Sequence, residues 1–166
     1  GSNYSETELV CLDKIDAKLI SLLQSNARMP LKQLAQAVYL SSPATAARIE
    51  KLTQEGIITG YGAKVSNKSL GCPIVAYINL EVSPSQKPQF YPFIRKCRNV
   101  LECSCVTGHY SMLIKVAFES TETLDAFIGR LQEYGSTQTQ IVFSTVVEHR
   151  DIVIQTEEDS SSKEEA

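Results

Sequence analysis

The sequence contains few of the residues on which catalysis, secretion or membrane insertion depends. Only two of the 166 residues are histidine, which leaves little for acid–base catalysis. No apolar run approaches the roughly 18 residues that a membrane span needs. The start lacks a basic segment followed by an apolar stretch, so we expect no signal peptide. The five cysteines are an odd number and widely spread, which favours reduced thiols in a cytoplasmic protein over a disulfide framework.

Motifs of the common enzymes and metal sites are missing as well. The sequence has no P-loop, Gly-rich dinucleotide turn, nucleophile elbow or HExxH motif. Cys103 and Cys105 form a CxC pair on a predicted strand, and Cys97 precedes them. No second Cys/His pair accompanies them, and His149 is distant in sequence. We therefore predict core cysteines, no metal, no cofactor and no enzymatic activity.

The formal net charge of −3 is unevenly distributed along the chain. Residues 1–60 carry six basic and six acidic side chains, residues 61–150 nine and seven, and residues 151–166 one and six. The last segment has almost no apolar residue after Ile154, so we expect an acidic disordered tail over 151–166. The rest is mildly basic, and the acidic total does not argue against nucleic-acid binding. Residues 1–11 are predicted to be an N-terminal arm that begins with Gly-Ser, typical of a scar from tag removal.

Three short helices are predicted in the first part of the chain. Apolar residues recur at intervals of three and four from Leu12 to Leu22 and again from Leu31 to Val38. Ser41 is placed to cap a third helix, and Gly56 is placed to end it. About four residues link the second and third helices, which is the outline of a helix-turn-helix.

The outward face of the third helix is predicted to carry small and basic residues. They are Ala44, Ala47 and Lys51, with Arg48 on the flank. Small side chains let a helix approach a DNA groove, and Arg and Lys reach phosphates or guanine edges. Glu50 and Glu55 instead favour a solvated face of a small three-helix module. Both interpretations stay open at this point.

The second half of the chain repeats a strand–helix–strand pattern. Strands are predicted over residues 72–82, 100–107, 110–118 and 138–148, and helices over 84–98 and from Ser120 or Thr121 onward. This order is the split βαβ, ferredoxin-like arrangement. The fold class is therefore α+β: a three-helix, winged-type helix-turn-helix domain at 12–56, a hinge strand and linker at 57–71, and a ferredoxin-like βαββαβ domain at 72–150.

The predicted sheet is apolar on both faces, although two helices can cover only one of them. Val75 and Tyr77 oppose the set of Ile74, Ala76 and Ile78. An apolar back generally marks a partner surface, so we expect at least a homodimer. A dimer would also present two helix-turn-helix units to two half-sites on one side of DNA.

Three segments form a recognisable combination: LDKIDAKLISLLQSNAR (12–28), LKQLAQAVYLSSPATAARIEKLTQEGIITGY (31–61) and VTGHY (106–110). In this order they resemble the Lrp/AsnC family of prokaryotic transcription regulators. Within them, Leu12-Asp13 with Asp16 matches the family's opening of helix one, and Arg48 matches the arginine of its recognition helix. The resemblance implies DNA binding by 12–56, a hinge strand at 57–66, and a regulatory, oligomerising module at 72–149. It also implies dimers that assemble into octamers and a nucleoid-associated, cytoplasmic protein.

Two sets of site residues follow from the residues and the resemblance together. The predicted DNA contacts are Ser41, Ser42, Ala44, Thr45, Ala47, Arg48 and Lys51. The family's effector site lies between dimers, at a Gly-containing turn and a Thr-rich start of the last strand. The matching positions are Thr107, Gly108, His109, Tyr110, Ser111, Thr137 and Thr139. The family turn usually carries acidic residues where this chain has His109 and Ser111, and a carboxylate at the second place would hold the α-amino group of an amino acid. An amino-acid effector, another ligand and no ligand therefore all stay open.

The predicted function is that of a sequence-specific DNA-binding transcription regulator that acts as an oligomer. One alternative is an architectural protein that wraps DNA with little sequence preference and binds with a steep salt dependence. A second is a haem-biosynthetic decarboxylase on the same architecture, although the chain offers few of the His and Arg residues that a tetrapyrrole pocket needs.

Overall fold

The computed structural model describes residues 12–154; the predicted arm at 1–11 and residues 155–166 of the predicted tail lie outside this range. The described chain divides into two compact units. The first comprises residues 12–63 together with 149–154, and the second comprises residues 64–148. No helix within the described range has both the length and the apolar character needed to cross a membrane.

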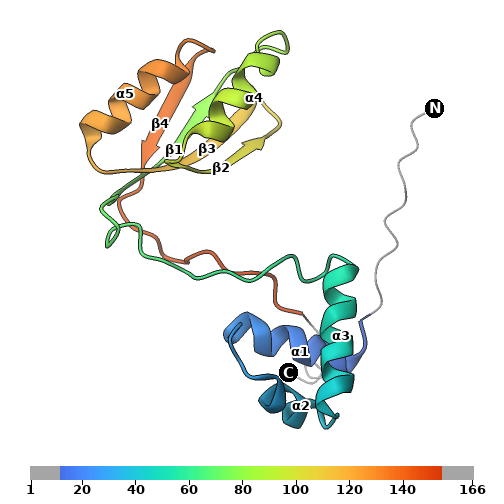
Figure 1. Ribbon diagram of the computed structural model, residues 1–166. Coiled ribbons are helices and arrows are strands. Elements are labelled where there is room, and N and C mark those ends of the chain that lie inside the picture. Colours follow the sequence, from blue (N-terminus) through green and yellow to red (C-terminus); the bar gives the residue numbers. More distant parts are fainter. Residues whose placement is uncertain (1–11, 155–166) are drawn as a thin grey trace, which may run out of the picture. The chain divides into compact units, whose positions relative to one another are not determined.

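The first unit is a bundle of three helices, as the sequence predicted. They are α1 (Lys14–Ser25), α2 (Leu31–Val38) and α3 (Ser42–Gln54) (Figure 1). Leu19, Leu34 and Val38 form its buried centre, so the predicted apolar stripes of α1 and α2 do face each other. Between α2 and α3 the chain reverses at Tyr39, which has a left-handed φ of 57°.

Both ends of α3 are fixed by local hydrogen bonds. The Ser41 side chain accepts a bond of 3.2 Å from the Ala44 amide, so the predicted N-cap is confirmed. At the other end, Gly56 has a φ of +74°, and the Ile57 amide donates to the Leu52 carbonyl at 3.0 Å. This Schellman arrangement requires a left-handed residue, which explains the glycine at this position.

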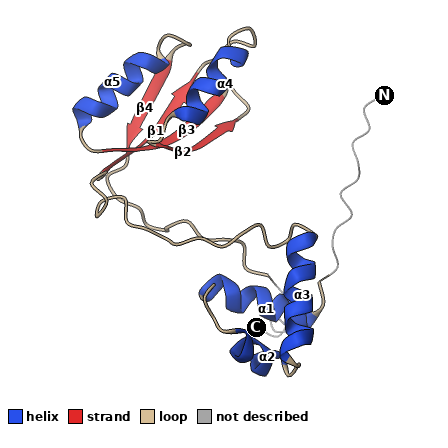
Figure 2. Ribbon diagram, in the orientation of Figure 1, coloured by secondary structure: helices blue, strands red, loops and turns tan. Residues whose placement is uncertain are grey.

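The second unit is a four-stranded antiparallel sheet with two helices. Its elements are β1 (Ile74–Leu80), α4 (Lys87–Lys96), β2 (Val100–Cys105), β3 (Met112–Phe118), α5 (Thr121–Leu131) and β4 (Thr137–Ile141). The strand order is β2-β3-β1-β4. Both helices lie on the same face of the sheet (Figure 2). The predicted ferredoxin-like arrangement is therefore confirmed.

The core of this unit lies between the sheet and its helices. In β1 the alternate residues Ala76, Ile78 and Leu80 have no exposed surface, and Phe90 and Leu131 of the two helices are equally buried. Every second side chain of β1 and the side chains at helical spacing on α4 and α5 thus pack together in one apolar layer. These are the faces that the sequence pattern predicted.

Two predicted strands differ from the structure. The strand expected at 138–148 ends at Ile141, and the Phe143 and Val146 side chains beyond it are almost completely exposed. The hinge strand expected within 57–71 is not formed by the described chain; residues 67–71 instead form turns. A strand exists only where a neighbouring segment supplies backbone hydrogen bonds, and β-branched composition alone does not supply them.

The predicted boundary at residue 150 also moves. Residues 149–154 belong to the first unit, where the Ile152 carbonyl accepts a hydrogen bond of 2.8 Å from the Gln24 side chain on α1. The ferredoxin-like unit therefore ends at Glu148, and residues 151–154 form part of the first unit and not the start of a separate tail.

Candidate functional site

The outward surface of α3 carries the predicted small and basic side chains. Ser41, Ala44, Ala47 and Lys51 are exposed, and Ser42 is half-buried. Lys51 Nζ lies 3.8 Å from the Glu55 carboxylate one turn later, a solvent-exposed pair that restrains the lysine only weakly. This surface leaves room for a close approach and offers one mobile positive charge and two hydroxyl groups.

Thr45 does not belong to that surface. Its side chain has no exposed area, and its Oγ1 donates a hydrogen bond of 2.9 Å to the Ser41 carbonyl one turn earlier. The helical period that places Ala44 and Ala47 outward turns Thr45 towards the interior of the bundle. We therefore do not retain Thr45 among the predicted DNA contacts.

Arg48 is engaged within the protein. Its guanidinium Nη1 lies 2.6 Å from Oδ2 of Asp13 and 3.2 Å from Oδ1 of Asp16, at the start of α1. Asp13 is also the N-cap of α1, because its Oδ1 accepts a 2.8 Å hydrogen bond from the Asp16 amide. The hydrogen bond from Arg48 is the main reason that the pKa of Asp13 is lowered from its ordinary value, and the same contacts raise the pKa of Arg48.

The ion pair connects α3 to the first turn of α1. It joins residues 35 and 32 positions apart in sequence, so it links α3 to α1 within the bundle. From the sequence, both aspartates are recognisable only as part of a family motif. Their common spacing of one helical turn, which places them on one face of α1, was the available signal that they share a partner.

The predicted effector residues lie at one end of the sheet. Gly108 has a φ of +105°, and the turn is closed by a 2.8 Å hydrogen bond from the Val106 amide to the Ser111 carbonyl. Thr137 pairs with Leu80, and Leu80 pairs with Met112. The turn and Thr137 therefore occupy the same end, with β1 between them.

Thr139 and Ser111 occupy positions that the sequence did not specify. Thr139 lies two residue pairs further into the sheet than Thr137, opposite Ile78. The Ser111 hydroxyl forms bonds of 3.2 Å with both the amide and the carbonyl of Val82, just beyond β1. Ser111 thus ties the turn to the end of β1.

A carboxylate missed by sequence reasoning lies at this same end. Glu81 directly follows β1, and its Oε2 is 3.2 Å from Nε2 of His109, whose ring packs edge-on against Tyr110. The His109 side chain is 73% exposed and the Glu81 side chain 45%. The Glu81 backbone carbonyl is approached so closely by Gly135 that a Cβ there would lie only 1.7 Å from it. Strand pairing, which no local pattern in the sequence specifies, brings an acidic residue to the turn.

The cysteines do not form a metal centre within residues 12–154, where no group of three His, Cys, Asp or Glu side chains is arranged to hold an ion. Cys97 and Cys103 are half-buried and Cys105 is exposed. Burial raises the pKa of the Cys97 and Cys103 thiols above their ordinary value. Cys105 Sγ lies 3.9 Å from the Lys87 ammonium.

Comparison with known proteins agrees with this architecture. The model of the Lrp/AsnC ligand binding domain matches residues 75–152, and that of a winged helix-turn-helix DNA-binding domain matches residues 12–59. The chain is 35% identical over 134 residues to YezC of Bacillus subtilis, described as an uncharacterized HTH-type transcriptional regulator, covering 81% of this chain and 95% of that protein.

Solved structures give the same result. The structure of E. coli AsnC has a TM-score of 0.79 and 32% identity, covering 87% of this chain and all of that chain. The transcriptional regulator NMB0573 from Neisseria meningitidis, solved as a complex with L-Met, has a TM-score of 0.79 and 25% identity, covering 89% of this chain and 99% of that one. With a DNA-binding helix-turn-helix unit, a ferredoxin-like ligand-binding unit and these relatives, the chain belongs to the Lrp/AsnC family of transcriptional regulators.

Proposed function

We propose that the chain recognises a specific DNA sequence through α3, as an oligomer, and that a small effector at the glycine turn modulates this binding. The observation that carries the proposal is the outward face of α3, where Ser41, Ala44, Ala47 and Lys51 are exposed together. Small side chains permit the helix to enter a major groove, and the hydroxyls and Lys51 supply hydrogen bonds to phosphates or base edges. A regulator of this kind works where the DNA is, so we expect the protein in the cytoplasm of a prokaryote.

Arg48 has a positioning role in this proposal. Two carboxylates within 3.2 Å offset its charge and hold its guanidinium against α1. A guanidinium already engaged by two carboxylates is poorly available to a phosphate. We therefore expect Arg48 to hold α3 in the orientation that DNA recognition needs, and Ser41, Ser42, Ala44, Ala47 and Lys51 to make the contacts.

The proposed effector site is the sheet end formed by residues 107–111 with Thr137. The fold is shared with NMB0573, whose structure contains L-Met, which supports an amino acid as the effector class. An amino acid needs a carboxylate for its ammonium group, and Glu81 beside His109 offers one at this end of the sheet. Glu81 would therefore replace the carboxylate that the family usually has at the position of Ser111.

The proposed assembly is a homodimer that associates further into an octamer. Two linking segments, residues 57–73 and 142–148, contain neither helix nor strand. Their large apolar side chains are exposed in the single chain: Val65 is 64% exposed, Phe143 101% and Val146 95%. Exposed apolar groups of this kind are typical of surfaces that a partner covers. Light scattering coupled to size-exclusion chromatography measures the assembly directly, and a monomer at micromolar concentration would contradict the proposal.

DNA recognition is tested by fluorescence anisotropy with the DNA upstream of the protein's own coding region and a scrambled duplex of equal composition. We expect tighter binding to the upstream DNA by about a hundredfold, within the usual range of specific over non-specific binding. Ala47→Glu should abolish the preference because a carboxylate on this face repels phosphates, whereas Glu119→Gln, far along the chain, is the matched control. Equal affinity for both duplexes with a steep salt dependence would instead indicate an architectural protein.

The effector is tested in the same assay with a pool of the common amino acids. We expect the pool to change the affinity for the upstream DNA, and Glu81→Gln to remove that change while leaving effector-free DNA binding intact. Glu102→Gln, an exposed glutamate on β2, is the matched control. An unchanged response in Glu81→Gln would show that Glu81 does not hold the ammonium group.

A further inference from the structure

A cavity far from the glycine turn shows the features of a second ligand site. It lies on the helix-covered side of the sheet, between the end of α4 and the start of α5, and has a volume of about 360 Å³. Phe118, at the last position of β3, lines it, whereas the glycine turn precedes the first position of the same strand. The two sites are therefore at opposite ends of β3.

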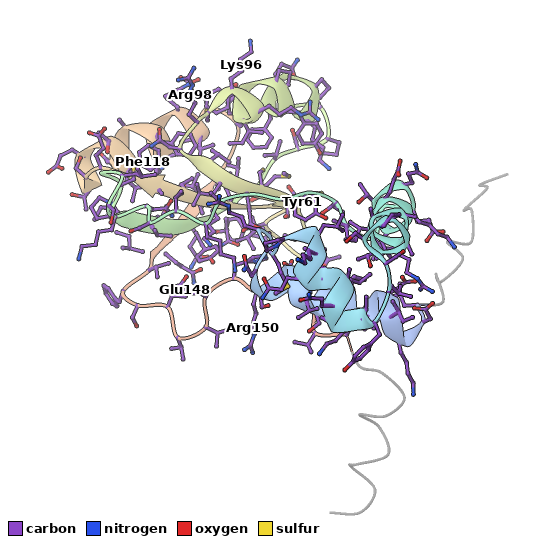
Figure 3. All side chains as sticks on the ribbon, turned by 60° about the horizontal axis from the view of Figure 1, so that its bottom comes forward. Tyr61, Lys96, Arg98, Phe118, Glu148 and Arg150 are labelled. Carbon is purple, nitrogen blue, oxygen red and sulfur yellow. The ribbon has the colours of Figure 1, made fainter. Side chains whose placement is uncertain are left out.

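The rim of this cavity is positively charged. Lys96, Arg98 and Arg130 line it, and its lining includes no carboxylate. Among the residues that the structure describes, these three side chains form no ion pair. Lys96 and Arg98 extend from the end of α4 on one side of the unit (Figure 3). Three uncompensated cations around one depression attract an anion and exclude a cation.

Arg130 is held in place by the aromatic floor. Its guanidinium carbon lies 4.8 Å from the centre of the Phe93 ring, within the range of a cation–π contact. The charge acts on the cavity, because Arg130 opposes the rise that burial causes in the pKa of the Cys97 thiol. The contact with Phe93 keeps this cation beside the cavity.

The floor itself is made of aromatic rings. Phe93 stacks on Phe127 with ring centres 6.5 Å apart, and Phe118 contacts Phe127 at 5.2 Å. Such surfaces favour a flat apolar body over a sugar or a free inorganic ion. A volume of about 360 Å³ falls within the range of roughly 300–1,000 Å³ that small-molecule sites occupy.

We propose that this cavity binds a small aromatic carboxylate without an amino group, such as an aromatic 2-oxo acid. The carboxylate pairs with Arg98, Arg130 and Lys96 at the rim. The ring packs against Phe93, the half-buried member of the aromatic floor, since Phe118 and Phe127 are only 7% and 4% exposed. An α-amino acid fits less well because its ammonium group would meet three cations and no lining carboxylate. The site thus distinguishes an amino acid from its deaminated counterpart, and it does not depend on the function proposed for α3 or the glycine turn.

The proposal is tested by calorimetric titration of the full-length protein with phenylpyruvate and with L-phenylalanine. We expect phenylpyruvate to bind at least about tenfold more tightly, and Arg98→Gln combined with Arg130→Gln to lower its affinity by at least about tenfold. Arg95→Gln, which removes an exposed arginine of α4 outside the cavity lining, should leave the affinity unchanged. If the double variant loses its circular dichroism signal, Arg98→Gln alone serves, because Arg98 is exposed and forms no ion pair in the described chain.

Alkylation of the cysteines locates the ligand independently. Cys97 lines the cavity and Cys105 does not, so phenylpyruvate should slow the alkylation of Cys97 and leave that of Cys105 unchanged, as measured by peptide mass spectrometry. Equal affinity for the two compounds, no binding of phenylpyruvate, or protection of Cys105 would each overturn the proposal. A loss of affinity for random DNA in the double variant would overturn it too, because the cations would then serve phosphate groups of DNA.

Discussion

Replacement of Asp13 separates the two roles that the structure gives this residue. Its carboxylate caps α1 through the Asp16 amide and pairs with Arg48 of α3. Asp13→Asn retains an oxygen that can accept from the amide but removes the charge, whereas Asp13→Ala removes both. The difference between the two variants therefore reports the cap, and the difference between Asp13→Asn and the parent reports the ion pair.

Loss of the cap should lower the stability more than loss of the ion pair. Loss of an N-cap aspartate costs about 1 kcal/mol, with a range of roughly 0.5–2. For a small unit of this size, 1 kcal/mol corresponds to a decrease in Tm of about 4–8 °C. The ion pair is exposed to solvent, with 54% of the Asp13 side chain accessible, so Asp13→Asn should lower Tm by less than Asp13→Ala does.

The assay combines thermal unfolding with DNA binding. Helix loss is followed by circular dichroism, and hydrogen exchange of peptides covering α1 and α3 identifies the unit that unfolds. Because Arg48 positions α3, Asp13→Asn should leave DNA affinity unchanged or lower it. An increase in DNA affinity would refute this reasoning, since it would show that Arg48 binds DNA directly and that Asp13 competes for it.

Four further outcomes follow from the packing and the charges. Gly135→Ala would place a methyl group 1.7 Å from the Glu81 carbonyl, so we expect a loss of about 1–3 kcal/mol in the free energy of unfolding by urea. Phe90→Ala empties a site with no exposed surface and should cost about 3–5 kcal/mol in the same measurement. Thr45→Val should leave the DNA affinity of the folded protein unchanged, because the Thr45 side chain is buried. A tenfold loss of affinity, measured by anisotropy, would show that Thr45 contacts DNA after all. Arg48 lowers the pKa of Asp13 from its ordinary value of 3.8. The Asp13 carboxylate therefore stabilises the unit at pH values above 3.8, and this contribution is lost as the pH falls through the lowered pKa. Asp13→Asn should accordingly weaken the dependence of Tm on pH below about pH 4.

Elements whose evidence is local could be predicted from the sequence. Neighbouring residues are enough to predict the caps of α3 at Ser41 and Gly56 and the apolar period of β1. The structure confirms both predictions. The ferredoxin-like arrangement could be predicted as well, because a short hairpin between two strand–helix units leaves few arrangements. The ends of β4 and the hinge could not be predicted in the same way. Hydrogen bonds to another segment decide where a strand ends, and composition carries no information about that segment.

The site residues divide along the same line. The outward position of Ala44, Ala47 and Lys51 follows from helical periodicity, and so does the inward position of Thr45. The engagement of Arg48 by Asp13 depends on how α3 packs on α1, which periodicity does not determine. Likewise Glu81 reaches His109 only because β1 pairs with β3 in the observed register. The role of a charged side chain is therefore harder to predict from sequence than the face of a helix on which it lies, because its partner comes from a distant element.

The exposed apolar residues of the linking segments reconcile the sequence pattern with the structure. The segment after Ile141 has the β-branched composition of a strand, yet Phe143 and Val146 remain exposed. Tyr61 and Val65 in the other linking segment are also more than half exposed. Apart from the hydrogen bond that the Val142 amide donates to the Val75 carbonyl, these segments form no strand in the described chain. A second copy that supplied a neighbouring strand would pair their exposed backbone groups. The strands predicted in these segments therefore give the proposal of a homodimer a second argument, beside the apolar back of the sheet at Val75 and Tyr77.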